Sequence, residues 1–458
     1  MLMQTILVLG AGLSSTSSIQ YFLDQSNNRW KVRVGDINLE RAMDAVGGHP
    51  LGEAFVFDVY KDSQRQEEIA HANIVISLLP ARMHHLVAET CVELGKNMVT
   101  ASYLSPAIKA LDEKAREKGI ILMNECGVDP GIDHMSAMQM IQLIKNEGAE
   151  LMAFESSTGG LVAPGFENNP WQYKFTWNPR NVVLAGKEGA RFLHNGKFKY
   201  IPYHKVFQRN ETIQVPGLGA FEVYGNRDSL TYRETYGLHN LQTMFRGTIR
   251  RPGFCEAWDI FVQLGATDDS YVMENTENLS YRDFINSFMA FRTDIPVEKK
   301  LANYLDLDED SEMMKRLQWL GIFDDRKIGE PGLTPARVLQ KILEEKWKLD
   351  PGDKDMIVMQ HQFDYMLKGV HIKRYSTMVY IGKNTRETAM AVTVGLPLAI
   401  TARRILEGHF SQTGVQLPIH PDIYNPVLKE LEEYNIRFVD EEVRISQVSL
   451  DQTGQNQT

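Results

Sequence analysis

The sequence predicts an α/β fold: a doubly wound parallel sheet of the Rossmann type, plus a second α+β substrate domain that carries a helical insertion. Three observations lead to this class. An apolar strand runs into a glycine-rich turn at residues 6–12, strands and helices alternate with short connections to residue 125, and short strands and turns follow from residue 151. Such alternation is typical of a parallel sheet covered by helices on both faces.

The first strand and turn give the strongest local signal. Four apolar residues lead into Gly10 and Gly12, and residues 14–23 have helical spacing. Gly10 allows a tight turn, Gly12 leaves room for a pyrophosphate, and the helix N-terminus offers free N–H groups and a positive dipole end. Because Ser15 replaces the third glycine of the fingerprint, an ordinary glycine turn of an α/β domain stays an alternative.

A second strand, residues 30–36, ends in Asp36, which lies 24 residues after Gly12. This is close to the spacing of about 20 residues at which an acid binds the ribose hydroxyls of NAD, and a carboxylate there repels the extra phosphate of NADP. The alternative is that Asp36 caps the helix beginning near Asn38. Together the two signals predict a dinucleotide-binding domain that takes NAD or NADP, with Asp36 favouring NAD.

The later strands of the first third place polar side chains where ligands bind in such sheets. Strands are predicted at residues 54–57, 74–77, 97–103 and 120–125, and ligands bind at the carboxyl ends of parallel strands. These ends carry Asp58, Ser77, Thr100, Ser102, Tyr103 and Glu125. Asp58 is expected beside the adenine end of the dinucleotide.

Composition limits the function classes. A net charge of -10 argues against nucleic acid and anionic membranes as partners, although it allows a basic pocket for an acidic substrate. The three cysteines are far apart, no metal-ligand spacing occurs, and His84 and His85 are expected to be ordinary surface histidines, so no metal is predicted. No leader peptide and no apolar run near the ~20 residues of a membrane span are evident, so a cytoplasmic protein is expected.

We expect three units. Residues 1–130 with about 388–445 form the dinucleotide domain, residues 131–280 with about 351–387 form an antiparallel α+β substrate and dimerisation domain, and residues 281–350 form a helical insertion. Within them, residues 356–381 are predicted to form a hairpin about Gly369. Residues 388–406 are predicted to form a long apolar helix, interrupted near Gly395 and Pro397, that packs back on the first domain.

The second domain offers two arginines as carboxylate ligands. Arg227 and Arg250 each follow turn-like sequence. An exposed arginine on a tight turn suits bidentate binding of a carboxylate. For each of them a solvated surface charge is the alternative.

Several motifs carry a resemblance to a known family. They run from the N-terminus to about residue 260, resume near residue 360, and include residues 8–12, 75–80, 99–106, 124–134, 159–164, 173–177, 226–229 and 246–250. With these motifs the chain resembles the saccharopine dehydrogenases of the L-glutamate-forming branch. The resemblance implies oxidation of saccharopine, with NAD or NADP, to glutamate and 2-aminoadipate 6-semialdehyde in lysine metabolism.

The resemblance also implies the site. Asp129 and Tyr103 are the catalytic candidates, since a proton must leave the secondary amine and an imine must be hydrolysed. The substrate-binding candidates are Ser102, Tyr103, Asp129, Arg227, Thr248, Ile249 and Arg250. The cofactor-binding candidates are Gly10, Gly12, Leu13, Ser14, Asp36, Asp58, Ser77, Leu78, Thr100, Ala101, Ser102, Val128, Asp129 and Thr176. Thr158 stands where the family often has a cysteine, so no thiol role is carried over.

Two other functions compete with this one. A carboxynorspermidine dehydrogenase or synthase would act on a polyamine conjugate, but the pair Arg227 and Arg250 suits a substrate with more carboxylates. A non-catalytic NAD-binding sensor would not need Asp129, Tyr103 and Arg250 together. Family precedent and the long apolar late helix also lead us to expect a homodimer.

Overall fold

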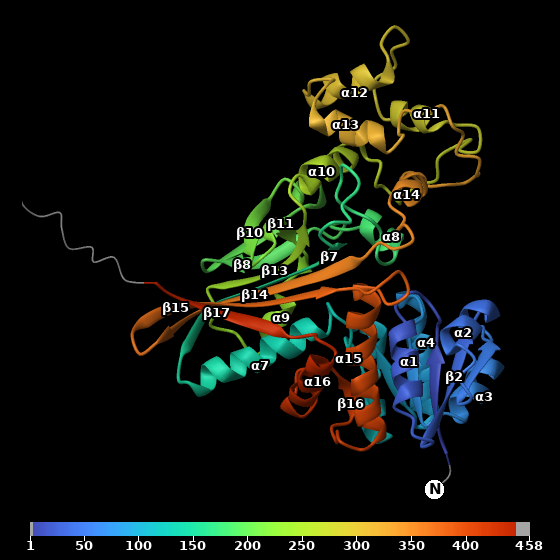
Figure 1. Cartoon of the computed structure of the whole chain (residues 1–458), viewed down its shortest axis with the longest axis vertical. Coiled ribbons are helices and arrows are strands. Elements are labelled where there is room, and N and C mark those ends of the chain that lie inside the picture. The colour runs from blue at the N-terminus through green and yellow to red at the C-terminus, as the bar shows by residue number, and fades with distance from the viewer. Residues whose placement is uncertain (1–2, 446–458) are drawn as a thin grey trace, which may run out of the picture.

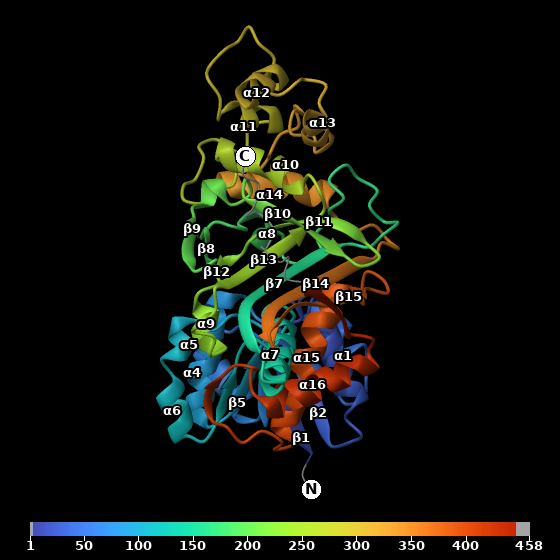
Figure 2. The same cartoon turned by 90° about the vertical axis from the view of Figure 1, so that its left-hand side faces the viewer.

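The computed structural model describes residues 3–445, which form two sheets and a helical projection arranged along the long axis of the molecule (Figure 1). The first sheet lies at the end of the molecule where the described chain begins, whereas its last strand, β17 (Phe438–Ile445), lies in the second sheet (Figure 1). The second sheet crosses the middle, and the helices of residues 281–346 project at the far end (Figure 2).

The first sheet confirms the predicted Rossmann-type fold. Its seven strands are parallel, in the order β16-β6-β5-β4-β1-β2-β3. They are β1 (Gln4–Leu9), β2 (Trp30–Asp36), β3 (Gly52–Val56), β4 (Ile74–Ser77), β5 (Asn97–Thr100), β6 (Ile121–Met123) and β16 (Gly414–Gln416). Strand order reverses between β1 and β4, and ligands bind at such a switch point in doubly wound sheets.

Helices cover both faces of this sheet. They are α1 (Thr16–Asp24), α2 (Leu39–Val46), α3 (Asp62–Ala70), α4 (His84–Leu94), α5 (Pro106–Lys109), α6 (Asp112–Glu117), α15 (Ala389–Leu406) and α16 (Pro421–Glu433). Alternate residues of β1 enter two cores, because Ile6 and Val8 pack with α15 while Leu7 and Leu9 pack on the α4 side.

Several predicted strands end earlier than expected. β5 ends at Thr100 and β6 at Met123, so Ser102, Tyr103 and Glu125 lie in the loops beyond the ladder. The Ser102 amide donates to Thr100 Oγ1 at 3.2 Å, which turns the backbone out of the strand.

The second sheet has ten strands and is mixed, which corrects the expected antiparallel sheet. Its main path is β10-β11-β13-β7-β14-β15-β17, and β13 runs parallel to β7. The strands are β7 (Glu150–Val162), β8 (Ala190–His194), β9 (Lys197–Ile201), β10 (Asn210–Val215), β11 (Gly219–Gly225), β12 (Arg227–Asp228), β13 (Thr243–Arg250), β14 (Asp355–Leu367), β15 (Val370–Ile381) and β17 (Phe438–Ile445). The hairpin about Gly369 is present as β14 and β15. β17 pairs with β15, so the chain after α16 returns to this sheet instead of staying with the first one.

The remaining helices flank the second sheet or form the projection. They are α7 (Ile132–Asn146), α8 (Pro179–Val183), α9 (Thr231–Thr235), α10 (Phe254–Leu264), α11 (Tyr281–Asn286), α12 (Val297–Leu305), α13 (Glu312–Trp319) and α14 (Pro335–Lys346), with short 3-10 turns η1 (Ala81–Met83) and η2 (Tyr203–Lys205). The projection shares one apolar core with α10, centred on Trp171, Trp258 and Trp347.

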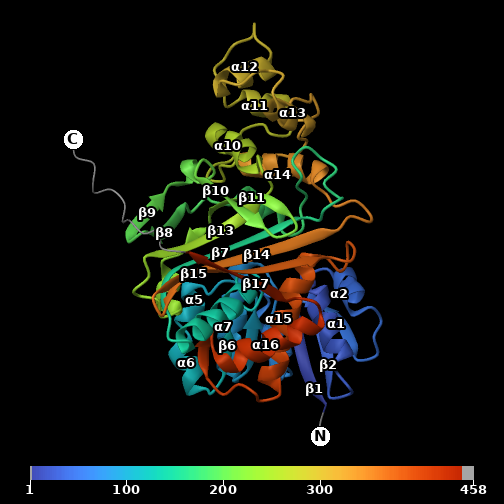
Figure 3. The same cartoon turned by 60° about the vertical axis from the view of Figure 1, so that its left-hand side comes forward.

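Helix α15 links the two sheets, since it packs on α1 and on β14 (Figure 3). It is continuous through Pro397, which corrects the expected interruption. By length and composition alone α15 is apolar enough to cross a membrane, closer to a membrane span than the sequence suggested, but 78% of it is buried inside the protein as a core helix.

Candidate active site

The glycine turn after β1 has the shape that the sequence predicts. Gly10 adopts a φ of 104°, and a Cβ there would lie 2.7 Å from the Leu78 carbonyl oxygen. At Gly12 no atom lies within 4 Å of the Cβ position, so the turn is open to a ligand there. Ser15 is buried, and its hydroxyl donates to the Gly12 carbonyl at 2.7 Å. The residue that replaces the third glycine therefore braces the turn.

Asp36 binds the same turn from the end of β2. Its Oδ2 accepts the Ala11 amide at 2.7 Å, and its Oδ1 accepts the Asn38 amide at 2.8 Å. Asn38, and not Asp36, caps α2, because its side chain accepts from Glu40 and Arg41. The capping alternative is therefore wrong.

Two candidates at the ends of β4 and β5, Ser77 and Thr100, are buried, and a histidine links Ser77 to Ser102 beyond β5. Ser77 and Thr100 lie side by side in the ladder, both fully buried. Ser77 Oγ lies 2.8 Å from His84 Nδ1, and Ser102 Oγ lies 2.7 Å from His84 Nε2. His84 is only 3% exposed, which corrects its interpretation as a surface residue. Burial, aided by the neighbouring charge of His85, lowers the pKa of His84 to about 4.

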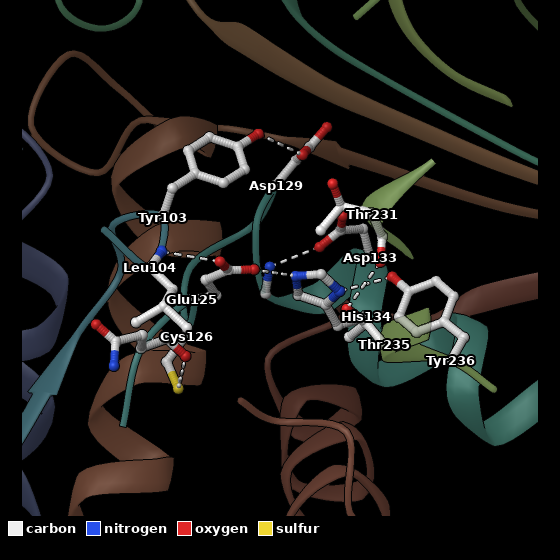
Figure 4. Close-up of polar contacts among 12 residues, drawn as sticks. Tyr103, Leu104, Glu125, Cys126, Asp129, Asp133, His134, Thr231, Thr235 and Tyr236 are labelled. Atoms are coloured by element: carbon white, nitrogen blue, oxygen red, sulfur yellow. Dashed lines mark hydrogen bonds and ion pairs between the residues drawn. The ribbon is translucent and has the colours of Figure 1, made fainter. Parts of the chain in front are cut away.

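The loops after β5 and β6 bring the two catalytic candidates together. The Tyr103 hydroxyl donates to Asp129 Oδ1 at 3.3 Å (Figure 4). The same Asp129 oxygen accepts from Arg246 Nη2 at 2.5 Å. The Arg227 guanidinium lies 5.1 Å from the centre of the Tyr103 ring, so this substrate candidate joins the group.

Arg246 was missed in the sequence, although it is the central cation of this group. Its Nη2 also donates to Asp133 Oδ2 at 2.7 Å, and its guanidinium lies 4.0 Å from the Tyr232 ring centre. Burial raises the pKa of Asp129, although Arg246 opposes this. Burial also acts on Asp133, but the charges of His134 and Arg246 prevail and hold its pKa below the usual range.

A second chain of buried hydrogen-bonded groups connects Glu125, in the loop after β6, to α7 and the end of α9. Glu125 Oε2 lies 2.6 Å from His134 Nε2, and His134 Nδ1 lies 2.6 Å from the Tyr236 hydroxyl (Figure 4). Burial lowers the pKa of His134, but Asp133 and Glu125 outweigh it and raise the pKa above its usual value. Asp133 and Glu125 therefore stabilise the charged form of the imidazole.

Strand β13 presents one polar face to this group. Side chains alternate along a strand, so Arg246, Thr248 and Arg250 share a face. Ile249 points the other way, fully buried in an apolar cluster with Leu161. Its side chain is not available to line a substrate site, which corrects that candidate.

Arg250 is buried, whereas the sequence suggested an exposed arginine on a turn. It is 4% exposed and is surrounded by the rings of Tyr173, Tyr224 and Phe254 at 5.3 to 5.8 Å. Nη1 donates to the Ile249 carbonyl at 2.9 Å, yet within residues 3–445 no carboxylate lies within ion-pair distance of this guanidinium. Because an uncompensated buried cation is costly, this environment suits an anionic ligand.

The remaining cofactor candidates are described by their own local contacts and burial. Leu13 is exposed at the tip of the glycine turn beside Ser14, and Asp58 accepts the Tyr60 amide at 3.1 Å beyond β3. The Val128 carbonyl accepts the Asp133 amide at 3.1 Å. Leu78 and Ala101 directly follow the ends of β4 and β5. The Thr176 hydroxyl is buried without a hydrogen-bond partner among residues 3–445, whereas Thr158 lies close enough to Asp129 to lower the pKa of that carboxyl.

The missed residues had signals in the sequence. Asp133 and His134 close the motif that carries Asp129, and Arg246 precedes Arg250 by four residues. The sequence before Arg250 was interpreted as turn-like, although Arg246, Thr248 and Arg250 follow the period of two of a strand.

Comparison with known proteins agrees with this geometry. Residues 6–123 match the family model "Saccharopine dehydrogenase NADP binding domain", and residues 127–436 match "Saccharopine dehydrogenase C-terminal domain". The chain belongs to the saccharopine dehydrogenase family. The predicted resemblance is therefore confirmed.

Relatives in this family match over almost the whole chain. "Saccharopine dehydrogenase [NADP(+), L-glutamate-forming]" of Schizosaccharomyces pombe is 31% identical over 449 residues, which are 96% of this chain and 99% of the relative. The mouse "Alpha-aminoadipic semialdehyde synthase, mitochondrial" is 32% identical over 94% of this chain, which corresponds to 47% of the relative. The solved structure of apo saccharopine dehydrogenase (L-Glu forming) from Saccharomyces cerevisiae has a TM-score of 0.86 and 30% identity, covering 96% of this chain and 100% of that chain.

The comparisons support the class of cofactor but not the predicted preference for NAD. They support a nicotinamide dinucleotide and, through the names of the family model and of the fungal relatives, favour NADP. The preference for NAD that Asp36 predicts receives no support from them.

Proposed function

We propose that this protein oxidises saccharopine to glutamate and 2-aminoadipate 6-semialdehyde, as an oxidoreductase acting on a CH–NH bond. The observation that carries the proposal is the shared face of β13. Arg250 offers a buried cation without a carboxylate partner in the described chain, and Arg246, four residues away, holds Asp129. Residues four apart in a strand lie about 13 Å apart, which suits a long substrate with carboxylates remote from its secondary amine.

The residues divide the chemistry between them. A nicotinamide coenzyme, held by the glycine turn at Gly12 and by Asp36, would supply the hydride acceptor for the substrate carbon next to the secondary nitrogen. Asp129 accepts the proton of that nitrogen, and its raised pKa favours this acceptance. Tyr103 donates a hydrogen bond to Asp129 and so fixes its orientation. Water then adds to the imine, the C–N bond breaks, and the protonated Asp129 returns its proton to the departing amine.

The first sheet fits a dinucleotide. The open space at Gly12 and the N-terminus of α1 suit a pyrophosphate, and Asp36 retains lone pairs that can accept ribose hydroxyls. A 2′-phosphate has no hydroxyl there to donate and adds negative charge beside the carboxylate. On this ground we propose that Asp36 disfavours NADP, in contrast to the cofactor that the fungal relatives' names carry.

The test is purified protein mixed with saccharopine and either NAD or NADP, following reduced nicotinamide by absorbance and glutamate among the products. Turnover with glutamate release supports the proposal, and the better coenzyme decides the role of Asp36. If saccharopine is not oxidised while carboxynorspermidine is, the polyamine alternative replaces it.

The homodimer and the cytoplasmic location stay predictions. Sedimentation equilibrium of the purified chain tests the first, and fractionation of the source cells tests the second.

A further inference from the structure

The short loop that carries Tyr103 is held on both sides. On one side, Ser102 Oγ lies 2.7 Å from His84 Nε2. On the other, the Leu104 amide donates to Glu125 Oε1 at 2.9 Å (Figure 4), and the Glu125 amide donates to the Ser102 carbonyl at 3.1 Å. Both chain neighbours of Tyr103 are therefore held by hydrogen bonds, one of them to His84.

His84 also reaches the neighbouring strand. Its Nδ1 lies 2.8 Å from Ser77 Oγ at the end of β4, so one imidazole joins two strand ends at the ligand edge of the first sheet. With its pKa lowered to about 4, this imidazole is neutral near pH 7. A neutral imidazole has one N–H and one lone pair, so one serine must donate to it and the other must accept from it.

We propose that His84 is a positioning residue that holds the Tyr103 loop through Ser102 and fixes Ser77 at the coenzyme edge of the sheet. The first half of this inference rests on the proposed function, because it concerns the position of Tyr103. The second half concerns coenzyme binding alone.

Two conservative substitutions of His84 distinguish the role of its contact with Ser102 from that of its contact with Ser77. The amide of His84→Asn lies near the position of Nδ1 and retains the bond to Ser77, whereas the amide of His84→Gln lies near Nε2 and retains the bond to Ser102. With coenzyme saturating, His84→Asn should lower kcat for saccharopine about tenfold, and His84→Gln should lower it less. The dissociation constant of the reduced coenzyme, measured by its fluorescence, should rise about fivefold in His84→Gln and remain within about twofold in His84→Asn.

Two further variants serve as controls for the His84 substitutions. His85→Asn changes the neighbouring, partly exposed histidine of α4 and should leave both quantities unchanged. Ser102→Ala breaks the same hydrogen bond from the other side and should reproduce the kcat of His84→Asn. Circular dichroism and thermal unfolding check that each variant is folded.

Equal changes in both quantities for the two His84 variants, or no change in either, overturn the inference. If the unaltered protein does not oxidise saccharopine, the proposed function fails by itself. The coenzyme dissociation constants then decide the inference, since a difference between the two variants supports it and equality overturns it.

Discussion

At the scale of single residues, Arg246 is the nearest positive charge that opposes the rise of the Asp129 pKa caused by burial. The guanidinium lowers the pKa of this carboxyl against the effect of burial. Only the ionised carboxylate accepts a proton, so kcat/KM for saccharopine oxidation should fall as the pH falls through the pKa of Asp129. Arg246→Gln removes the cation, raises that pKa, and should move the acid limb of the profile upward by about one pH unit or more.

Arg246→Lys is the matched control, because it retains a charge between the two carboxylates. It should keep the acid limb near its original pH even if kcat falls. Thermal unfolding shows whether either variant is damaged as a whole. An acid limb that stays in place in Arg246→Gln would remove Asp129 as the group that titrates.

Arg250 should determine substrate affinity and not coenzyme affinity. Arg250→Met retains the packing against Tyr173 and Phe254 but removes the charge. The KM for saccharopine should rise roughly a hundredfold, the cost of leaving a carboxylate without its buried cation. Arg251→Met is the control, because Arg251 pairs with Glu167 at 2.5 Å and should change KM little. If saccharopine kinetics are alike in both variants, Arg250 does not bind substrate.

The sequence indicated the identity of many site residues but not their surroundings. Asp129 and Tyr103 were recognisable because they lie in specific motifs, and they lie together. The burial of Arg250 and the bridge made by His84 could not be inferred, since each depends on side chains from elements distant in sequence. Spacing along a helix predicts its neighbours on that helix, not the serines that close around it.

At the scale of elements, the contact between α15 and α1 depends on Gly395. A Cβ at this position would lie 2.8 Å from the Ser18 amide nitrogen. Gly395→Ala should therefore lower the free energy of unfolding by about 1–3 kcal/mol, and Gly395→Val by more. Because α1 begins at the glycine turn proposed to bind the pyrophosphate, coenzyme affinity should fall in the same order. Denaturant unfolding measures the stability, and coenzyme titration measures the affinity. An unchanged free energy of unfolding in Gly395→Val would show that α1 and α15 can move apart without loss of stability.

Elements with a strong periodic pattern of apolar residues could be predicted from the sequence. Strands whose place depends on pairing with a distant segment could not. The β14–β15 hairpin follows from alternation and Gly369. The sequence before Arg250 was interpreted as turn-like, although Gly247 lies in the ladder of β13, opposite Ser157 and Gly225. Parallel pairing of β13 with β7 joins segments about ninety residues apart, and no local pattern encodes it.

At the scale of the whole molecule, fold class and family were predictable because alternation and motifs extend over most of the chain. The way in which α15 ties the two sheets was visible only as an apolar helix near the end of the sequence. A helix that is buried on all sides in a protein core is apolar around its whole circumference, as a membrane-spanning helix is. The two therefore have similar sequences, and only the structure shows that α15 is a core helix.

The net charge of the chain gives a prediction for coenzyme choice. On the proposed role of Asp36, a protein with a charge of -10 should repel NADP more than NAD, and the Asp36 carboxylate should add a local repulsion of the same sign. Raising the ionic strength from about 0.01 M to about 0.1 M shortens the screening length from about 30 Å to about 10 Å. The ratio of kcat/KM with NAD to kcat/KM with NADP should therefore fall with salt, by about two- to fivefold.

Two variants identify the source of this effect. Asp36→Asn keeps the size of the side chain and one acceptor oxygen but removes its charge, so it should lower the ratio at every ionic strength. Arg41 is exposed on α2 and is the nearest basic side chain along the chain to Asp36 on its C-terminal side. If the ratio instead rises with salt, the extra phosphate is held by an exposed cation. Arg41→Gln should then abolish that rise, and the discriminating role of Asp36 would be lost.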